Sequence, residues 1–460
     1  MIKDKVMKKS KYEEMRHFIR RFQGIIQVAL LTILYYVIWR SYGLDVFPAY
    51  YGRGKYVLMG IYAILVFLLF HYSDGFRYGH SKLSDITVSQ CIAIFLVNFL
   101  SYWQLSLIAN VMINPVPILI LTIIDFVICI FFCYLYTAIY HKYHTPRDIV
   151  MIYGTENALD LEVKMSTRSD KYNITSKISV DKGIEKICNE IKKHEAVLLN
   201  DVPAQIRNDV LKFCYTNAVR VYAAPKLSDI IISGAEEICL FDTPLLLVKG
   251  TGLNLEQRFL KRAMDVVLCS IAMVVAAPIM LVVAIAIKME DGGPVFFKQK
   301  RATIDGKTFE ILKFRSMIVD AEKFGEVIPA TDKDPRITKV GNIIRATRID
   351  ELPQILNILK GEMSIVGPRP ERVEHVEKYS KDIPEFSYRL KVKGGLTGYA
   401  QIYGKYNTSA YDKLRLDLMY IEKYSLLLDI KLILMTLQIM LRKESTEGFK
   451  NEEKETHTGH

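Results

Sequence analysis

The sequence places two acidic side chains, Asp350 and Glu351, next to each other in a stretch that is rich in arginine. Arg345 precedes the pair, and Pro368-Arg369-Pro370 follows it as a rigid turn that carries one guanidinium. Carboxylates bind divalent metal ions and arginines bind phosphate oxygens, so this combination indicates phosphate chemistry with a metal ion. Asp350 and Glu351 are the candidate catalytic residues and metal ligands, and the candidate substrate contacts here are Arg345, Pro368, Arg369 and Pro370.

The acidic pair stands where a short helix is expected to begin. Apolar residues recur at helical spacing from Leu352 to Leu359, and Pro353 is tolerated only in a first turn. The helix is therefore predicted to start near Asp350, with both carboxylates at its positive end. Taken alone, such a pair is more simply explained by compensation of the helix dipole, worth roughly 0.3–1 kcal/mol. The chemical interpretation depends on the surrounding motifs.

Further basic side chains are expected from a β-hairpin over Val295–Phe314. Asp305-Gly306 is a turn signal between two strand-like runs, and Lys313 and Arg315 stand at the end of the second run. Either cation can reach a phosphate, and an exposed strand end explains each of them equally well. The next stretch, Glu322–Arg345, is polar and predicted to be mainly loop.

A glycine-rich loop follows at Gly394–Gln401. Such a loop lets the backbone approach a ligand closely, and Gln401 is then a candidate substrate contact. A purely structural turn explains the spacing equally well. Tyr411–Leu441 predicts a long helix whose later part lies against a membrane interface, and the tail after Arg442 is charged and expected to be disordered.

The 460 residues carry a formal net charge of +11, and half of them are apolar. The apolar residues gather in long runs, which indicates membrane segments beside soluble parts. The sequence shows no nucleic-acid-binding motif and no zinc-type Cys/His spacing, so the positive charge favours anionic lipid and phosphorylated substrates as partners. The seven scattered cysteines are predicted to be free thiols.

Four apolar segments are near the length that crosses a bilayer, at Gly24–Tyr42, Tyr56–Tyr72, Ser89–Ala109 and Pro115–Tyr140. Basic residues crowd before the first segment and lie between the second and third. By the positive-inside rule, the N-terminus and everything after the fourth segment lie in the cytoplasm. Asp125 stands inside the fourth segment, where structural pairing with Asn98 or Gln104 is favoured over a functional role.

Residues 148–250 alternate short apolar runs with helical patterns. Asp148–Tyr153, Ala196–Leu199 and Val219–Ala223 are predicted to be buried parallel strands of a small α/β domain. A dinucleotide site would need G-x-G-x-x-G after the first strand, and only Gly154 is present there. We interpret this region as a degenerate nucleotide-fold domain with a structural or regulatory role.

The apolar run Lys261–Ile287 is long enough for a fifth crossing. Pro278 stands in its middle, and both flanks are basic. Because a proline breaks the helical hydrogen-bond ladder and basic flanks favour the cytoplasm, a kinked re-entrant helix hairpin is favoured over a crossing. A crossing would place the acidic pair outside the cell, away from nucleotide donors.

From about Phe259 to Arg442 the sequence resembles the bacterial sugar transferases, the monotopic polyprenyl-phosphate hexose-1-phosphate transferases also called phosphoglycosyl transferases. The matching blocks, in order, are KRAMDVV, GPVFFKQKR, FEILKFRSM, IDELPQILNILKGEMSIVGPRP, GGLTGYAQI and LDIKLIL. The N-terminal helices and the degenerate domain resemble the large form that initiates capsule or exopolysaccharide assembly. Two positions depart from the pattern, because Ala277 stands where many members have serine and Tyr399 where tryptophan is common.

The resemblance implies transfer of a hexose 1-phosphate from a UDP-sugar to undecaprenyl phosphate, with release of UMP, on the cytoplasmic face of the bacterial plasma membrane. It also implies an Asp-Glu dyad, here Asp350-Glu351, that works with Mg²⁺, and a re-entrant helix broken at a proline, here Pro278. We hypothesise that Asp350 attacks the sugar-bearing phosphorus and that polyprenyl phosphate then displaces the enzyme. The rival is direct transfer, with both acids acting as metal ligands only.

Two other functional classes are alternatives. A membrane-bound nucleotide-sugar dehydratase or epimerase also combines four helices with a nucleotide fold, but it needs the glycine fingerprint that is missing here. A non-catalytic scaffold of a polysaccharide assembly complex would release no UMP from a UDP-sugar.

The expected architecture is a membrane α-helical bundle of four transmembrane helices (1–141), a degenerate α/β nucleotide-fold domain (142–252), a mixed α+β catalytic domain (253–442) and a charged tail (443–460). The catalytic domain is expected to contain the re-entrant membrane helix, at about 261–287. A homo-oligomer is compatible with the sequence, which identifies neither the oligomeric state nor the sugar.

Overall fold

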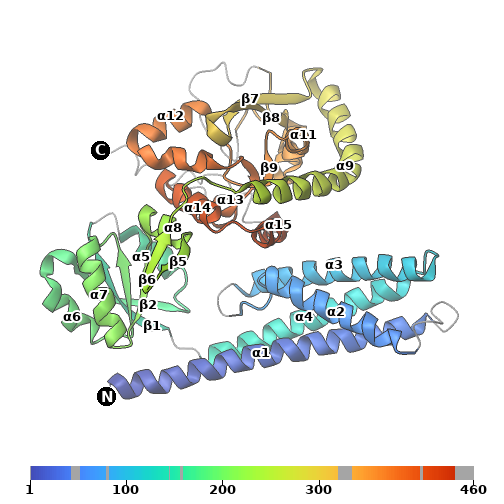
Figure 1. Ribbon diagram of the computed structural model, residues 1–460. Helices are drawn as coiled ribbons and strands as arrows, with labels where there is room; N and C mark the ends of the chain where they lie inside the picture. Colours follow the sequence, from blue (N-terminus) through green and yellow to red (C-terminus); the bar gives the residue numbers. More distant parts are fainter. Residues whose placement is uncertain are drawn as a thin grey trace. The chain divides into compact units, whose positions relative to one another are not determined.

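The computed structural model of the chain describes residues 2–42, 52–78, 82–143, 146–155, 159–319, 334–404 and 408–440. The chain divides into two compact units, Met1–Lys226 and Leu227–His460 (Figure 1). The first unit holds a bundle of long helices and a small sheet, and the second holds the acidic pair. The tail after Arg442, which we expected to be disordered, lies outside the described residues.

Long helices occupy the four apolar segments of the first unit: α1 (Ile2–Ser41), α2 (Gly54–Tyr72), α3 (Leu83–Ala109) and α4 (Val116–Tyr143). Together with α9 (Leu255–Asp291), the described part of the chain contains five helices that are long and apolar enough to cross a membrane. Many of their large apolar side chains are exposed in the isolated protein, as lipid-facing positions require. The number of crossings stays a prediction.

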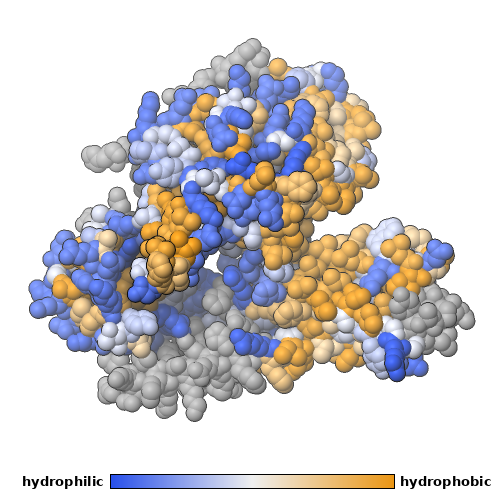
Figure 2. Space-filling model, in the orientation of Figure 1, coloured by the Kyte–Doolittle hydropathy of each residue, from blue (hydrophilic) through white to orange (hydrophobic). Residues whose placement is uncertain are grey.

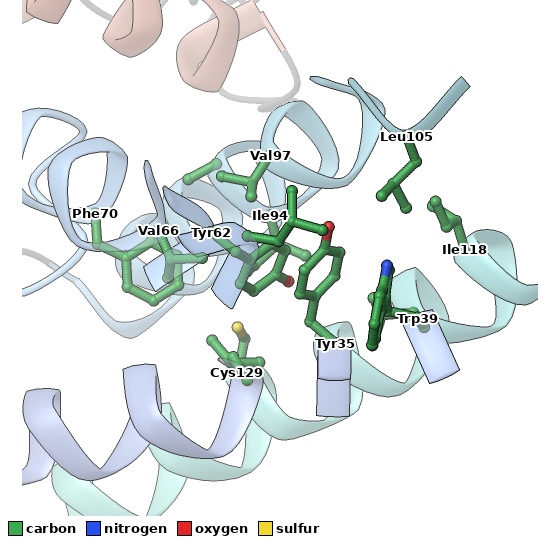
Figure 3. Packing of buried hydrophobic residues seen from close by; sticks show 14 of the residues in the cluster. Tyr35, Trp39, Tyr62, Val66, Phe70, Ile94, Val97, Leu105, Ile118 and Cys129 are labelled. Atoms are coloured by element: carbon green, nitrogen blue, oxygen red, sulfur yellow. The ribbon is translucent and has the colours of Figure 1, made fainter. Parts of the chain in front are cut away.

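Polar side chains pair inside this helical bundle. The rings of Tyr35 and Tyr62 stack with their centroids 4.1 Å apart (Figure 3). The Tyr62 hydroxyl donates to Asp125 Oδ2 at 3.2 Å, and Asn98 Nδ2 donates to the same oxygen at 3.0 Å. The predicted structural pairing of Asp125 with Asn98 is therefore confirmed, whereas Gln104 forms no bond to Asp125 among those that the structure describes.

A parallel sheet follows in the first unit, with the strand order β2-β1-β3-β4. Its strands are β1 (Arg147–Tyr153), β2 (Tyr172–Ser179), β3 (Ala196–Asn200) and β4 (Arg220–Ala223), and its helices are α5 (Asp160–Ser166), α6 (Ile184–Ile191) and α7 (Ala204–Thr216) (Figure 1). The three predicted strands are present. We missed β2 because it is an edge strand in which half-buried positions alternate with exposed ones.

Gly154 has a packing role at the end of β1. A side-chain carbon at this position would lie 2.1 Å from the carbonyl oxygen of Asp201, so only glycine fits against this backbone. The Thr155 hydroxyl also donates to Asp201 Oδ2 at 2.8 Å. The turn after β3 thus fills the space beside this glycine, while residues 156–158 lie outside the described residues.

The second unit combines short strands with helices. Its elements besides α9 are α8 (Leu227–Ser233), β5 (Glu236–Leu240), β6 (Thr243–Leu247), β7 (Phe296–Ala302), β8 (Thr308–Phe314), α10 (Lys339–Ala346), α11 (Gln354–Lys360), β9 (Ser364–Val366), α12 (Val373–Asp382), β10 (Gly395–Thr397), α13 (Tyr399–Tyr403), α14 (Ala410–Glu422) and α15 (Leu426–Met440). The predicted hairpin is confirmed by the antiparallel pairing of β7 with β8. One core lies around α14 and α15, and another joins α9, β8 and α11.

The apolar run that we predicted to be a kinked re-entrant helix hairpin is one continuous helix, α9, with Pro278 inside it. Figure 1 shows that α9 changes direction sharply along its length. A proline removes one backbone N–H donor and kinks a helix, while the hydrogen bonds on both sides can continue. The predicted kink agrees with this bend, and re-entry into the membrane stays a prediction.

Candidate active site

The acidic pair lies on a tight turn between two short helices. Arg348 takes the left-handed conformation with a φ of 55°, and Ile349–Glu351 (η5) then forms one turn of 3-10 helix. The regular helix α11 begins only after Pro353, because proline has no N–H for the preceding turn and clashes with the carbonyl one turn back. The prediction that the helix starts near Asp350 was therefore wrong by about one turn.

Helix α10 leads into this turn, in a stretch that we had predicted to be mainly loop. The Thr338 hydroxyl caps it by accepting a hydrogen bond from Gly341 N at 2.9 Å, and Ile344 is buried. A helix this short has few apolar positions, so its periodic signal is weak. Its last turn carries Arg345, whose charge acts on Asp350.

Glu351 is held by two cations. Lys313 Nζ from the end of β8 and Arg369 Nη2 from the turn after β9 both donate to Glu351 Oε1, each at 2.8 Å. Burial opposes ionisation of Glu351, but the charges of Arg369 and Lys313 outweigh it and hold the pKa of this carboxyl well below its usual range. Glu351 is therefore ionised at neutral pH, and its carboxylate holds both cations beside Asp350.

Asp350 has a different environment. Within the part of the chain that the structure describes, its carboxylate has neither a hydrogen bond nor an ion pair. Partial burial and the neighbouring charge of Glu351 raise the pKa of Asp350, while Lys313, Arg345 and Arg369 oppose this rise. An unpartnered carboxylate beside fixed cations is suited to attack an electrophilic phosphorus or to hold a metal ion.

Arg315, another candidate substrate contact, is used structurally. Its guanidinium pairs with both carboxylate oxygens of Asp291 at the end of α9, and its Nε donates to the carbonyl of Pro294 at 2.7 Å. The side chain is only 8% exposed. The structure therefore assigns Lys313 to the acidic pair, and it assigns Arg315 to the junction between α9 and the hairpin.

The glycine-rich loop packs against the turn that carries Arg369. A side-chain carbon at Gly394 would lie 2.5 Å from the ring of Pro370, and Gly395 N donates to the carbonyl of Pro368 at 2.8 Å. Gln401 Nε2 donates to the carbonyl of Gly367 at 3.3 Å. Of the two explanations of this loop, the structural one is supported, because these residues shape the Arg369 turn.

The oxygen atoms near Asp350 are the candidate ligands of the expected Mg²⁺. No group of three or more acidic, histidine or cysteine side chains able to hold a metal ion occurs among the described residues. The oxygens of Asp350 and Oε2 of Glu351 carry no hydrogen bond there. Mg²⁺ commonly binds through one or two protein carboxylates and completes its shell with phosphate oxygens and water. The residues present therefore fit Mg²⁺ together with a phosphorylated substrate.

Sequence reasoning did not identify Asn357 as part of the support of the site. This buried side chain of α11 donates to the carbonyl of Glu310 at 2.8 Å and accepts from Leu312 N at 2.9 Å. It therefore fixes β8, which carries Lys313 near its end, to the helix that follows Glu351. A polar residue within an apolar helical run is the signal that could have found it.

The second unit is similar in sequence to a known protein family. A family model described as "Bacterial sugar transferase" matches residues 256–443. An Escherichia coli protein named "UDP-glucose:undecaprenyl-phosphate glucose-1-phosphate transferase" is 44% identical over 45% of this chain and 43% of its own length. A Haemophilus influenzae protein named "Uncharacterized sugar transferase" is 31% identical over 65% of this chain and 70% of its own length.

A third relative differs in the sugar that its name specifies. The Aeromonas hydrophila protein "UDP-N-acetylgalactosamine-undecaprenyl-phosphate N-acetylgalactosaminephosphotransferase" is 42% identical over 40% of this chain and 44% of its own length. The chain spans about half the length of the first relatives that it matches, with 43% and 58% of their residues covered.

Replacing each acid by its amide should change stability in opposite directions. The folded pKa of Asp350 is raised, so its ionised form costs stability at neutral pH, and Asp350→Asn should raise the unfolding midpoint slightly. Ionised Glu351 stabilises the fold above its ordinary pKa, and this stability is lost as the pH falls toward the lowered value. Glu351→Gln should therefore cost about 1–3 kcal/mol at neutral pH. Thermal unfolding measures both, and equal losses in the two variants would contradict this difference.

Proposed function

Because the chain belongs to the bacterial sugar transferase family, we propose that it transfers a hexose 1-phosphate from a UDP-sugar to undecaprenyl phosphate. The reaction releases UMP and is the first step of exopolysaccharide or capsule assembly. The observation that carries this proposal is the carboxylate of Asp350, which has no partner among the described residues and lies beside Lys313 and Arg369, the two cations that Glu351 holds in place. The sugar stays open, because the relatives' names specify both glucose and N-acetylgalactosamine.

The proposed reaction consists of two displacements at one phosphorus. A carboxylate oxygen of Asp350 attacks the phosphorus that bears the sugar, and the bond from this phosphorus to the bridging oxygen breaks. UMP leaves with that oxygen and its electron pair. A phosphate oxygen of undecaprenyl phosphate then attacks the same phosphorus and releases the carboxylate. Two successive displacements let two anionic substrates use one site in turn.

The cations around Asp350 bind and orient the phosphates. Lys313 and Arg369 each use one N–H on Glu351, which leaves other donors for phosphate oxygens. Arg345, in the last turn of α10, adds positive charge that acts on Asp350. Mg²⁺, when bound by Asp350 and Glu351, supplies further neutralisation of the diphosphate charge. In the rival mechanism Asp350 serves only as a metal ligand and never bonds to phosphorus.

The proposed site lies on the cytoplasmic side of the membrane, and α9 enters the bilayer and returns. Near the start of α9, Lys261 Nζ donates to Asp429 Oδ2 at 2.6 Å, and at its end Asp291 pairs with Arg315. Both ends are therefore attached to the same folded unit. Val274 in the middle is 76% exposed, and Figure 2 shows hydrophobic surface along the outer side of α9. Apolar exposure between two anchored ends supports re-entry rather than a crossing.

Membranes that contain the chain should release UMP steadily from at least one UDP-hexose or UDP-N-acetylhexosamine when undecaprenyl phosphate is supplied. Asp350→Asn should lower this rate by at least ~10³-fold, because either mechanism needs the carboxylate. Glu310→Gln is the control, since the Glu310 side chain is 56% exposed and pairs only with Lys298 among the described residues. Release from none of the UDP-sugars, or equal release by Asp350→Asn, would contradict the proposed function.

A cysteine introduced at either end of α9, in addition to the seven native cysteines, should report the same side of the membrane. Glu256→Cys and Met289→Cys lie before and after the apolar part of α9, at exposed positions. In intact cells, a membrane-impermeant maleimide should label neither position beyond the parent chain, and both should react in opened cells. Arg53→Cys, in the loop expected outside, is the positive control. Labelling of only one end of α9 in intact cells would show that the helix crosses the membrane.

A further inference from the structure

A buried ion pair lies directly behind the turn that carries Arg369. Arg389 comes from the 3-10 segment Pro384–Lys391 (η6), and Asp417 comes from α14. Arg389 Nε donates to Asp417 Oδ2 at 2.9 Å, and Nη2 lies 2.8 Å from the same oxygen. The two side chains are only 3% and 1% exposed, so neither can meet a substrate directly.

The same guanidinium also holds the backbone of the active-site turn. Arg389 Nη2 donates to the carbonyl oxygen of Arg369 at 2.9 Å. Arg301 Nη1 donates to the next carbonyl oxygen, that of Pro370, at 3.2 Å. Two guanidinium groups therefore fix consecutive peptide units, and the side chain of Arg369 extends from the first of them to Glu351.

Stability alone does not account well for this pair. Burying two charges costs desolvation energy that their attraction often fails to recover. Burial raises the pKa of Asp417 to about 6 even though Arg389 opposes this rise. Asp417 Oδ1 is buried and has no hydrogen-bond partner in the described structure. One oxygen of this ion pair therefore has no hydrogen-bond partner, while its guanidinium holds the backbone of Arg369 in place. Apolar side chains at the same positions could not hold that backbone.

We propose that Arg389 and Asp417 are positioning residues, which fix the backbone of Arg369 so that its guanidinium meets Glu351 and the phosphate next to Asp350. The inference rests on the proposed function and assigns the pair to the same site. Asp417 orients the planar group of Arg389, and Arg389 transmits that orientation through one hydrogen bond. Lysine cannot replace Arg389, because one ammonium group cannot donate to both the Asp417 carboxylate and the Arg369 carbonyl as the planar guanidinium does.

A double-mutant cycle tests this role, with kcat and KM for the UDP-sugar measured separately. Arg369→Lys should lower kcat/KM by about 10²-fold and Asp417→Asn by about tenfold, because small displacements of a positioned group are costly in catalysis. If Asp417 acts through Arg369, the double variant should lose little more than Arg369→Lys alone. Losses that multiply would show that Asp417 only stabilises the fold, and would overturn the proposal.

A matched control comes from another arginine–aspartate pair of the unit, that of Arg315 with Asp291. Asp291→Asn removes the carboxylate partner of Arg315 without touching the Arg369 turn. Its effect should multiply with that of Arg369→Lys. If the losses of kcat/KM from Asp291→Asn and Arg369→Lys also fail to multiply, then any damage to the fold gives the same non-additivity. That result would overturn the proposal. Where Asp417→Asn does not fold, Arg389→Lys takes its place in the cycle, with the same expected coupling to Arg369→Lys.

A second readout does not depend on activity. Amide hydrogen exchange in residues 364–372 should be faster in Asp417→Asn than in the parent chain, and unchanged in Asp291→Asn. Unchanged exchange in Asp417→Asn would contradict the positioning role even in a preparation that releases no UMP. Absence of UMP release by the parent chain would instead contradict the proposed function, so the two failures are distinguishable.

Discussion

Two cations from distant parts of the chain share one oxygen of Glu351, and the geometry of the candidate active site depends on that oxygen. Lys313 lies near the end of β8, and Arg369 lies in the turn after β9. Each cation has its own support. Asn357 fastens β8 to α11, and Arg389 holds the carbonyl of Arg369. Because two supported cations meet on one carboxylate, the site is fixed in position before a substrate arrives, which is the arrangement that charge stabilisation requires.

The neighbouring acids Asp350 and Glu351 have different surroundings, which suit them to different roles. Glu351 has two cationic partners that hold its pKa below the usual range, whereas Asp350 has none in the described structure and its pKa is raised. Adjacent carboxyl groups with opposite shifts commonly have different roles. Glu351 is suited to constant ionisation and the organisation of cations. Asp350 has no hydrogen-bond partner among the described residues, as the proposed attack on phosphorus or binding of a metal ion requires.

The sequence predicted the elements that have strong periodic patterns. The four N-terminal helices, three of the four parallel strands and the β7–β8 hairpin have long apolar runs or a clear turn signal. It also singled out Lys313, Arg345 and Arg369 beside the acidic pair. The sequence could not predict the features that depend on contacts between residues far apart in the chain. Strand patterns do not show that Arg315 pairs with Asp291, and propensities do not show that the left-handed Arg348 sets the acids on a separate turn.

A chain incubated with a UDP-sugar labelled in the sugar-linked phosphate, without undecaprenyl phosphate, tests most directly whether Asp350 is the nucleophile. We predict that mass spectrometry of the digested protein finds a hexose phosphate on Asp350. Addition of undecaprenyl phosphate should remove this label, and Asp350→Asn should never acquire it. A preparation that turns over with the lipid but carries no label at Asp350 would contradict the covalent route and favour direct transfer.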